Sequence, residues 1–413
     1  MLRVAFLGVP PVGGPRTFFI NLRDGLAPHG IDMFWLGSGR REAQLAVERG
    51  LYDEAPDGLI VAQESDDDLT RMKALMDYIS GQGIRVVLLN SDPIPVPAGL
   101  AFCLAADVKR IFIVHHPSPM TYRMSRAIRD HVDCTVAVSP RAQRDLVRYH
   151  GFSPDRTVCI PHGKDPAPAD GERPKRAFGA PLRVIYVGRV EDGQKGVLWL
   201  PEILERAIAA GANVGLTVAG DGPDLATLTN AVSQRGLRSR VRSIGQFPPD
   251  CLQPLLKSHD VLLLPSRLEG FGYVLLEAMA AGCVPVASRI HGVTDFVIQD
   301  GRTGFLFPVG SVRAAAKHLA RLASDPALLA AASAAALADV RARFSVAQQA
   351  ERYAALIHNT IEMPRALPQP VPLESWSPPR GFRPGWWYWL PLPIKNALRV
   401  ARERVLQGGG MQT

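Results

Sequence analysis

The chain has 413 residues, of which 47% are hydrophobic and 21% are charged, and its formal net charge is +8. This length is enough for two or three domains with buried cores, and the composition excludes a wholly disordered or fibrous protein. No run of 18 apolar residues occurs, so the sequence predicts no helix that crosses a bilayer. The five cysteines are scattered singly and form no CxxC or Cys/His group, so the sequence predicts neither a disulfide framework nor a zinc site. The reducing cytoplasm fits this pattern best.

Short apolar runs alternate with amphipathic segments over residues 1–165. The runs read as strands at Arg3–Gly8, Met33–Leu36, Leu59–Val61, Arg85–Leu89, Arg110–Val114 and Thr135–Val138. Helices are expected between them, for example at Thr17–Pro28, Asp67–Ser80 and Pro140–Tyr149. Apolar strands separated by helices favour a parallel sheet that is covered on both faces. The sequence therefore predicts one doubly wound α/β domain over residues 1–165.

Residues 166–181 are rich in Pro, Gly, Ala and charge, without any period, and read as an interdomain linker. A second α/β series follows over residues 182–363. Its strands are expected at Arg183–Gly188, Val214–Ala219, Arg240–Gly245, Val261–Pro265, Val284–Ser288 and Gly304–Phe307. Helical segments are expected at Lys195–Ala210, Asp224–Arg235 and Leu268–Ala281. This pattern predicts a second doubly wound domain.

The tail, residues 364–413, has a different composition. Nine prolines lie between Pro364 and Pro393, and four of the chain's six tryptophans follow Glu374. Seven basic residues against two acidic ones contribute +5 of the net charge, and Pro393–Leu406 reads as a short basic helix. Basic and aromatic residues suit an anionic membrane surface. The alternative is that the tail packs on the N-terminal domain, and the sequence leaves both open.

Two glycine turns each follow the first strand of a domain. The first reads PPVGGP and includes Gly14; it lacks the GxGxxG fingerprint and reads equally well as a plain turn. The second carries Gly188, Arg189 and Lys195. Backbone amides at such turns bind anions, and an Arg fork with a Lys point charge suits a diphosphate. The alternative for the second turn is two surface cations on a loop.

The strongest pattern is PSRLEGFGYVLLEAM, in which seven residues separate Glu269 from Glu277. Glu269 is expected on a loop, followed by Gly270, Phe271 and Gly272, and Glu277 on the helix beyond them. Ionised carboxylates accept hydrogen bonds from hydroxyl groups, so the pair suits a hydroxyl-rich ligand. The apolar continuation after Glu277 argues against two merely solvated glutamates.

His115 and His116 follow an apolar run directly, at the strand end where parallel sheets bind ligands. A structural role is an equal alternative for His116. Arg123, Arg126 and Arg129 come next at a spacing of three, which places them on roughly one helix face. Such a stripe suits an acceptor phosphate or a lipid surface, and a solvated face is the alternative.

These motifs together resemble the retaining glycosyltransferases of family 4, which have the GT-B fold of two Rossmann-like domains facing a cleft. The segment EGFGYVLLE is similar to the family's E-x7-E motif, and VGRVEDGQKG to its diphosphate-binding Arg and Lys. AGDGP, VPPVGG and VAVSPRAQRDLVRYHG also match the family pattern, so the resemblance covers about residues 1–360. His162-Gly163 departs from a usual Asn-Gly, and His291-Gly292-Val293-Thr294-Asp295 from a usual Gly-Gly-x-x-Glu.

The resemblance implies a role for each matching residue. Arg189 and Lys195 would hold the donor diphosphate, Glu277 the ribose hydroxyls and Glu269 the hydroxyls of the donor sugar. His115 would contact that sugar near its reacting carbon, and Gly14 and Gly188 would let the backbone approach. Gly270, Phe271 and Gly272 would offer backbone donors, and His116, Arg123 and Arg126 would meet an acceptor or lipid.

The implied reaction moves a sugar from a UDP- or GDP-linked donor to a glycan or lipid-linked acceptor with retention of configuration. It needs neither metal nor other cofactor, because cations and helix dipoles neutralise the leaving diphosphate. Asp66-Asp67-Asp68 accordingly reads as a helix cap rather than a metal site. Nucleic acid is disfavoured as a partner. Thirty-nine of the 47 basic residues are Arg, which suggests a GC-rich bacterial genome and polysaccharide or glycolipid synthesis. A nucleotide-sugar epimerase and a catalytically silent scaffold remain alternatives.

Overall fold

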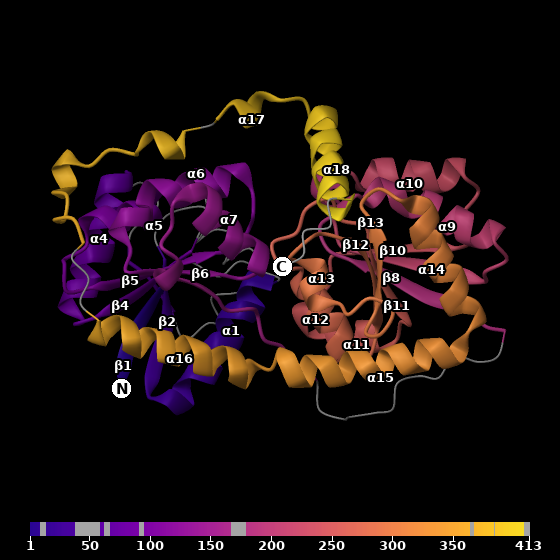
Figure 1. Ribbon diagram of the computed structural model, residues 1–413, viewed down its shortest axis with the longest axis horizontal. Coiled ribbons are helices and arrows are strands. Elements are labelled where there is room, and N and C mark those ends of the chain that lie inside the picture. The colour runs from indigo at the N-terminus through magenta and orange to yellow at the C-terminus, as the bar shows by residue number, and fades with distance from the viewer. Residues whose placement is uncertain are drawn as a thin grey trace. The chain divides into compact units, whose positions relative to one another are not determined.

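The computed structural model describes residues 1–8, 14–37, 58–61, 67–90, 95–166, 179–363, 367–383 and 385–408. Contacts divide the chain into two units (Figure 1). The first unit comprises residues 1–163 and 346–389, and the second comprises residues 164–345 and 390–413. Each unit is built on one parallel sheet.

The sheet of the first unit has seven strands within the described residues, in the order β3-β2-β1-β4-β5-β6-β7. The strands are β1 (Leu2–Leu7), β2 (Ile31–Gly37), β3 (Gly58–Ile60), β4 (Val86–Asn90), β5 (Lys109–Val114), β6 (Cys134–Ala137) and β7 (Thr157–Cys159). Helices of this unit are α1 (Gly14–Leu26), α4 (Asp68–Gly81), α5 (Pro95–Cys103), α6 (Pro119–Ile128), α7 (Pro140–His150), α16 (Val346–Glu362) and α17 (Trp386–Trp389). The predicted strands are confirmed to within two residues, and β7 was missed.

The second unit repeats this plan, with six strands in its described part, in the order β10-β9-β8-β11-β12-β13. They are β8 (Leu182–Val187), β9 (Val214–Ala219), β10 (Val241–Gly245), β11 (Val261–Leu264), β12 (Val284–Arg289) and β13 (Phe305–Pro308). Its helices are α8 (Asp192–Lys195), α9 (Leu200–Ala209), α10 (Leu225–Gln234), α11 (Leu252–Lys257), α12 (Tyr273–Ala280), α13 (Thr294–Val297), α14 (Val312–Ser324), α15 (Pro326–Arg343) and α18 (Leu392–Gly408). Both sheets follow the order of doubly wound nucleotide-binding folds, as predicted.

One predicted helix of the second unit is broken. A continuous helix was expected over residues 195–210, but α8 ends at Lys195 and α9 begins at Leu200. Gly196 between them has φ +64°, and a Cβ at this position would collide with the carbonyl oxygen of Pro265. Glycine tolerates both conditions, so it ends α8 where the turn passes close to the β11 loop.

The domain boundary predicted at residue 363 is wrong. Helix α16 belongs to the first unit, where it packs so closely on α1 that a Cβ at Gly25 would lie 2.6 Å from the Cβ of Ala350. Gln349 of α16 also accepts a hydrogen bond from the amide of Gly163 at 3.0 Å. The apolar stripe of α16 indicates that the helix is buried, but a stripe does not say against which domain.

The tail does not form a unit of its own. Its first part packs on the first unit, where Trp376 is only 8% exposed within the core and the amide of Val371 donates to the carbonyl of Phe102 at 2.9 Å. Arg123 of α6 donates to the carbonyl of Arg380 at 3.2 Å. The packing alternative is therefore confirmed for this part. Helix α18, close to the predicted Pro393–Leu406, belongs to the second unit.

Candidate active site

The glycine turns that follow β8 and β9 touch each other. Gly188 has φ +144°, and a Cβ at Gly220 would collide with the carbonyl oxygen of Gly188. The Tyr186 hydroxyl donates to the carbonyl of Arg189 at 2.6 Å, and burial raises the pKa of this phenol. The first residues of the predicted diphosphate turn are thereby held in place by their own strand.

Arg189 and Lys195 have different partners in this turn. The Nζ atom of Lys195 lies 2.8 Å from Oε1 of Glu269, and the side chains are 19% and 5% exposed. Arg189 is 68% exposed, and its Nε lies 3.5 Å from Oε2 of Glu191. The structure thus joins Lys195 to the E-x7-E segment, whereas the convergence of both cations on one anion stays a prediction.

Glu269 lies on the loop between β11 and α12, as predicted. Its Oε1 accepts a second hydrogen bond, at 2.6 Å, from the Ser266 hydroxyl. Gly270, Phe271 and Gly272 complete the loop, and Gly272 has φ +81° at the N-cap of α12. Phe271 is buried against Phe344, with ring centroids 6.1 Å apart. Phe271 thus packs the loop against a second buried ring of the same unit.

Glu277 lies on α12, also as predicted, and is 6% exposed. Burial raises the pKa of this carboxyl to about 7, and the positive charge of Lys164 partly opposes the shift. A carboxyl with this pKa is close to half ionised at neutral pH. Such perturbed groups gather at functional sites, because burial that costs stability is retained where a ligand offsets it.

Two residues that the sequence analysis missed connect the Lys195 turn to the Glu269 loop. The Arg267 guanidinium stacks 3.8 Å from the centroid of the Trp199 ring, and its Nη1 lies 3.0 Å from Oδ2 of Asp192. The amide of Arg267 donates to the carbonyl of Gln194 at 2.8 Å. Asp192 and Arg267 lie inside the two motifs, but nothing in their spacing indicates that they pair.

In the first unit, His115 follows β5 at the carboxyl edge of the sheet. Its Nε2 lies 2.9 Å from Oδ1 of Asn90, and Nδ2 of Asn90 donates to the carbonyl of Leu7 at 2.9 Å. Because the Asn90 amide nitrogen is committed to Leu7, its oxygen accepts, and the hydrogen lies on Nε2 of His115. Burial lowers the pKa of His115 to about 4, so the ring is neutral at pH 7.

His162 joins the same cluster, in stacked orientation with its ring centroid 5.9 Å from that of His115. The Phe18 ring meets both edge-on, at 5.3 Å from His115 and 4.9 Å from His162. Burial, aided by His115, lowers the pKa of His162 well below its usual value. Asn90 also ends a strand, so the argument that selected His115 could have selected Asn90 too.

The remaining predicted residues have separate surroundings. Gly14 is the first residue of α1, and the rest of its turn, residues 9–13, lies outside the described residues. His116 is half-buried, Arg126 is exposed, and Arg123 is engaged by the tail. Asp67 caps α4 by accepting from the amide of Thr70 at 2.8 Å, which confirms the predicted cap, whereas Asp66 lies outside the described residues.

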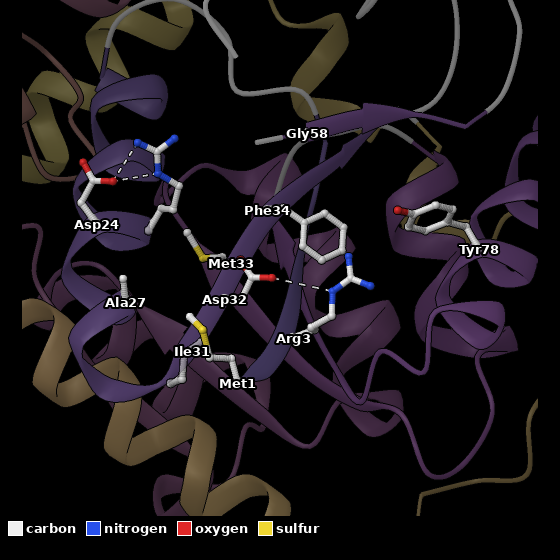
Figure 2. A pocket seen from close by; sticks show the side chains of 11 residues that line it. Met1, Arg3, Asp24, Ala27, Ile31, Asp32, Met33, Phe34, Gly58 and Tyr78 are labelled. Atoms are coloured by element: carbon white, nitrogen blue, oxygen red, sulfur yellow. Dashed lines mark hydrogen bonds and ion pairs between the residues drawn. The ribbon is translucent and has the colours of Figure 1, made fainter. Parts of the chain in front are cut away.

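The first unit contains a hollow of about 490 Å³, and Figure 2 shows the side chains that line it. It is lined by Met1, by Arg3 of β1, by Ile31 and Asp32 at the start of β2, and by further residues of α1, β2, β3 and α4. These positions lie at the amino ends of the strands. His115 and Asn90 lie at the carboxyl ends, so this hollow is not the candidate site.

Family models match both halves of the chain. Residues 12–167 match "Glycosyltransferase Family 4", and residues 181–325 match "Glycosyl transferases group 1". The chain belongs to the family 4 glycosyltransferases.

Curated relatives of this family 4 protein include D-inositol 3-phosphate glycosyltransferase of Corynebacterium glutamicum, 29% identical over 48% of this chain and 50% of the relative. Alpha-D-kanosaminyltransferase of Streptomyces kanamyceticus is 34% identical over 35% of this chain and 37% of the relative. The 2-deoxystreptamine glucosyltransferase of the same organism is 32% identical over 41% of this chain and 45% of the relative. The chain therefore spans about half the length, or less, of these relatives.

Solved structures confirm the GT-B fold. Anabaena HepE in complex with UDP-glucose has a TM-score of 0.71 at 18% identity, covering 87% of this chain and 100% of HepE. The lipopolysaccharide outer core galactosyltransferase WaaB has a TM-score of 0.67 at 20% identity, covering 86% of this chain and 100% of WaaB. At this identity the likeness concerns the fold.

In this family 4 chain the segment His291–Asp295, which departs from the usual Gly-Gly-x-x-Glu pattern, is held together by its own hydrogen bonds. Asp295 stands where the family usually has Glu. Its Oδ1 accepts from the amide of Gly292 at 2.7 Å, and its Oδ2 lies 3.2 Å from Nδ1 of His291. Asp295 therefore ties residues 291 and 292 to the start of α13.

Proposed function

We propose that the protein transfers a sugar from a nucleoside-diphosphate sugar to a hydroxyl group of a glycan or lipid-linked acceptor, with retention of configuration. The observation that carries the proposal is the ion pair of Lys195 and Glu269, with 2.8 Å between Nζ and Oε1. It joins the turn that suits a diphosphate to the loop whose carboxylate suits sugar hydroxyls. Glu277, buried on the next helix, supplies a carboxylate of a kind that ribose hydroxyls satisfy.

In the proposed reaction the bond between the anomeric carbon and the diphosphate oxygen breaks, and a bond to the acceptor oxygen forms on the same face. The acceptor's proton leaves on the departing diphosphate. Arg189 and Lys195 stabilise the charge that develops on the diphosphate, without a metal. Neutral His115 contacts the donor sugar through a hydrogen bond, and Glu269 accepts from its hydroxyls.

We further propose a bacterial polysaccharide or glycolipid pathway in the cytoplasm. Single scattered cysteines and an Arg-rich composition support this setting. WaaB, which shares the fold, is named for the lipopolysaccharide outer core. Curated relatives are named for D-inositol 3-phosphate and for 2-deoxystreptamine, so both compounds belong in an acceptor screen beside lipid-linked sugars.

Thermal unfolding with UDP, GDP or ADP tests the donor site directly. A nucleotide at 100 times its dissociation constant adds about 2.7 kcal/mol to the free energy of unfolding. We expect a shift with one base that disappears in the Arg189→Ala/Lys195→Ala variant. Nucleotide release from the matching sugar donor, dependent on an added acceptor, then separates transfer from epimerisation. No shift with any nucleotide would favour a silent scaffold.

Asn90 is expected to act on the reaction through His115. Replacing Asn90 with Leu removes the acceptor for Nε2–H, so the ring loses its fixed tautomer and orientation. We expect kcat to fall about tenfold or more, since misplacement by 1 Å costs up to 10², while the affinity for the nucleotide stays unchanged. Gln143→Leu, which removes a side-chain bond to the carbonyl of Thr157, is the matched control. Equal losses in both variants would contradict the role of Asn90.

A further inference from the structure

Helix α18 packs on the second unit through polar side chains. Arg399 donates from Nη1 to the carbonyl of Gly193 in the Lys195 turn. Oε2 of Glu403 accepts from the amide of His291 at 3.1 Å. Nε2 of Gln407 donates to the carbonyl of Arg289 at 3.0 Å. Three successive turns of the helix are thus bonded to the Lys195 turn and to residues 289 and 291 at and just after the end of β12.

These contacts fix which face of α18 points inward. Glu403 is 2% exposed, and Val400 packs on a cluster of Ile290, Val293 and Val309 beside Trp199. The buried carboxylate would lose its partner if the helix rolled about its axis, so the orientation is strongly determined. The face that carries Arg399, Glu403 and Gln407 cannot turn to solvent at low cost.

The opposite face is apolar and exposed. Ile394, Leu398 and Val405 are 47%, 45% and 72% exposed, and Ala401 is exposed between them. At 100° per residue these four side chains fall within an arc of about 60°. The exposed Arg402 lies about 40° beyond the Leu398 edge of that arc, and the exposed Arg404 lies about 60° beyond its Ala401 edge. The helix is therefore amphipathic with an unusual orientation: Val400 and the polar groups named above face the protein, and an apolar stripe with basic flanks faces solvent.

We propose that the outward face of α18, the stripe of Ile394, Leu398, Ala401 and Val405, binds an anionic membrane surface. An apolar stripe between Arg side chains matches the boundary of acyl chains and anionic headgroups. The segment just before α18 supports the same environment, because Trp386, Tyr388 and Trp389 are 73%, 61% and 76% exposed. Aromatic side chains of this kind prefer the headgroup region.

The contact is peripheral. Among the described residues, no single helix is long and apolar enough to cross a bilayer. One helix pair, Val312–Ser324 with Pro326–Glu362, is together long and apolar enough for a membrane span, but the two helices are bent by 106° at the break between them. The proposed helix lies flat on the membrane, so the depth that it reaches is set by the Leu398 and Val405 side chains.

Co-sedimentation of the full chain with lipid vesicles tests the proposal. We expect strong binding to equimolar phosphatidylcholine and phosphatidylglycerol, and weak binding to phosphatidylcholine alone. Leu398→Asp/Val405→Asp should reduce the partition coefficient at least tenfold. Arg402→Gln/Arg404→Gln should reduce it about 25-fold on anionic vesicles, at about fivefold per lost charge, and little on neutral ones. Tyr149→Asp/Met363→Asp, at exposed apolar positions on other elements, is the matched control.

Three outcomes would overturn the proposal. These are no binding of the unchanged chain to anionic vesicles, equal binding by the Leu398→Asp/Val405→Asp variant, and a dimer in light scattering that this variant dissociates. The last would identify the stripe as a contact between two copies. Stabilisation by the nucleotide should persist in every variant, which shows that the inward face is intact. Failure on vesicles with intact acceptor-dependent nucleotide release would reject the membrane contact and leave the proposed function standing.

Discussion

Replacing Lys195 with Ala is expected to lower kcat by about 10²–10³, because removal of one preorganised donor to a developing negative charge costs that much. In the ligand-free protein Lys195 is paired with Glu269 at 2.8 Å. In the proposed reaction a bound diphosphate would bring a larger negative charge to the same ammonium. The charge on the leaving diphosphate grows in the transition state, so the loss should appear in kcat more than in KM.

The Lys195→Ala variant also leaves Glu269 buried without its cation, which costs about 3–5 kcal/mol when a buried pair is broken. Thermal unfolding must therefore accompany the kinetics. Arg206→Ala is the matched control, because it removes an exposed pair with Glu202 in the same unit. A folded Lys195→Ala protein with a kcat within threefold of the unchanged enzyme would contradict the assigned role.

Replacing Glu277 with Gln is expected to stabilise the ligand-free protein at pH 8 and, at the same time, to weaken nucleotide binding. The pKa of Glu277 rises from 4.5 to about 7 in the folded state. The folded protein then holds a proton that the unfolded chain releases, so stability falls as pH rises from about 4.5 to 7 and stays lower above it. The penalty at pH 8 is on the order of 3 kcal/mol, at 1.36 kcal/mol per pKa unit. Glutamine avoids this penalty but is a weaker acceptor for the ribose hydroxyls.

The pH dependence of nucleotide binding tests the same group by a second route. Hydrogen bonds from ribose favour the ionised carboxylate, so binding should release a proton near pH 7. The affinity should weaken below pH 7, by at most tenfold per pH unit if only the ionised form binds. Calorimetry at pH 6, 7 and 8 in two buffers measures both effects. Glu277→Gln should abolish the proton release; a release that persists in this variant would assign it to another group.

The two substitutions act on neighbouring parts of one candidate site with opposite effects on stability. Lys195 neutralises a buried carboxylate, whereas Glu277 lies buried with only partial compensation from Lys164. The first charge supports the fold and, in the proposed reaction, the leaving group. The second destabilises the fold and, in the proposed reaction, would gain hydrogen bonds from the hydroxyl groups of the ligand. A combined stability and binding series therefore separates the two roles within one protein.

Much of the architecture follows from the amino-acid sequence alone. Apolar runs of strand length, separated by amphipathic helices, predicted two doubly wound domains, and the structure contains a parallel sheet with a doubly wound strand order in each unit. Glu269 lies on its loop and Glu277 on its helix because the intervening Gly272 starts α12 with φ +81°. These features are local: a strand, a glycine turn and a helix start depend on residues within a few positions of one another.

The tertiary structure decided the contacts between distant segments. The stripe of α16 indicated a buried helix, but only packing placed it against α1. Asn90 and His162 reach His115 from other strand ends, across 25 and 47 positions of sequence. The basic helix α18 has two possible faces to bury, and the bonds of Glu403 and Gln407 select the polar one. An amphipathic pattern predicts that a face is buried, whereas the partner of that face depends on side chains brought together only by folding.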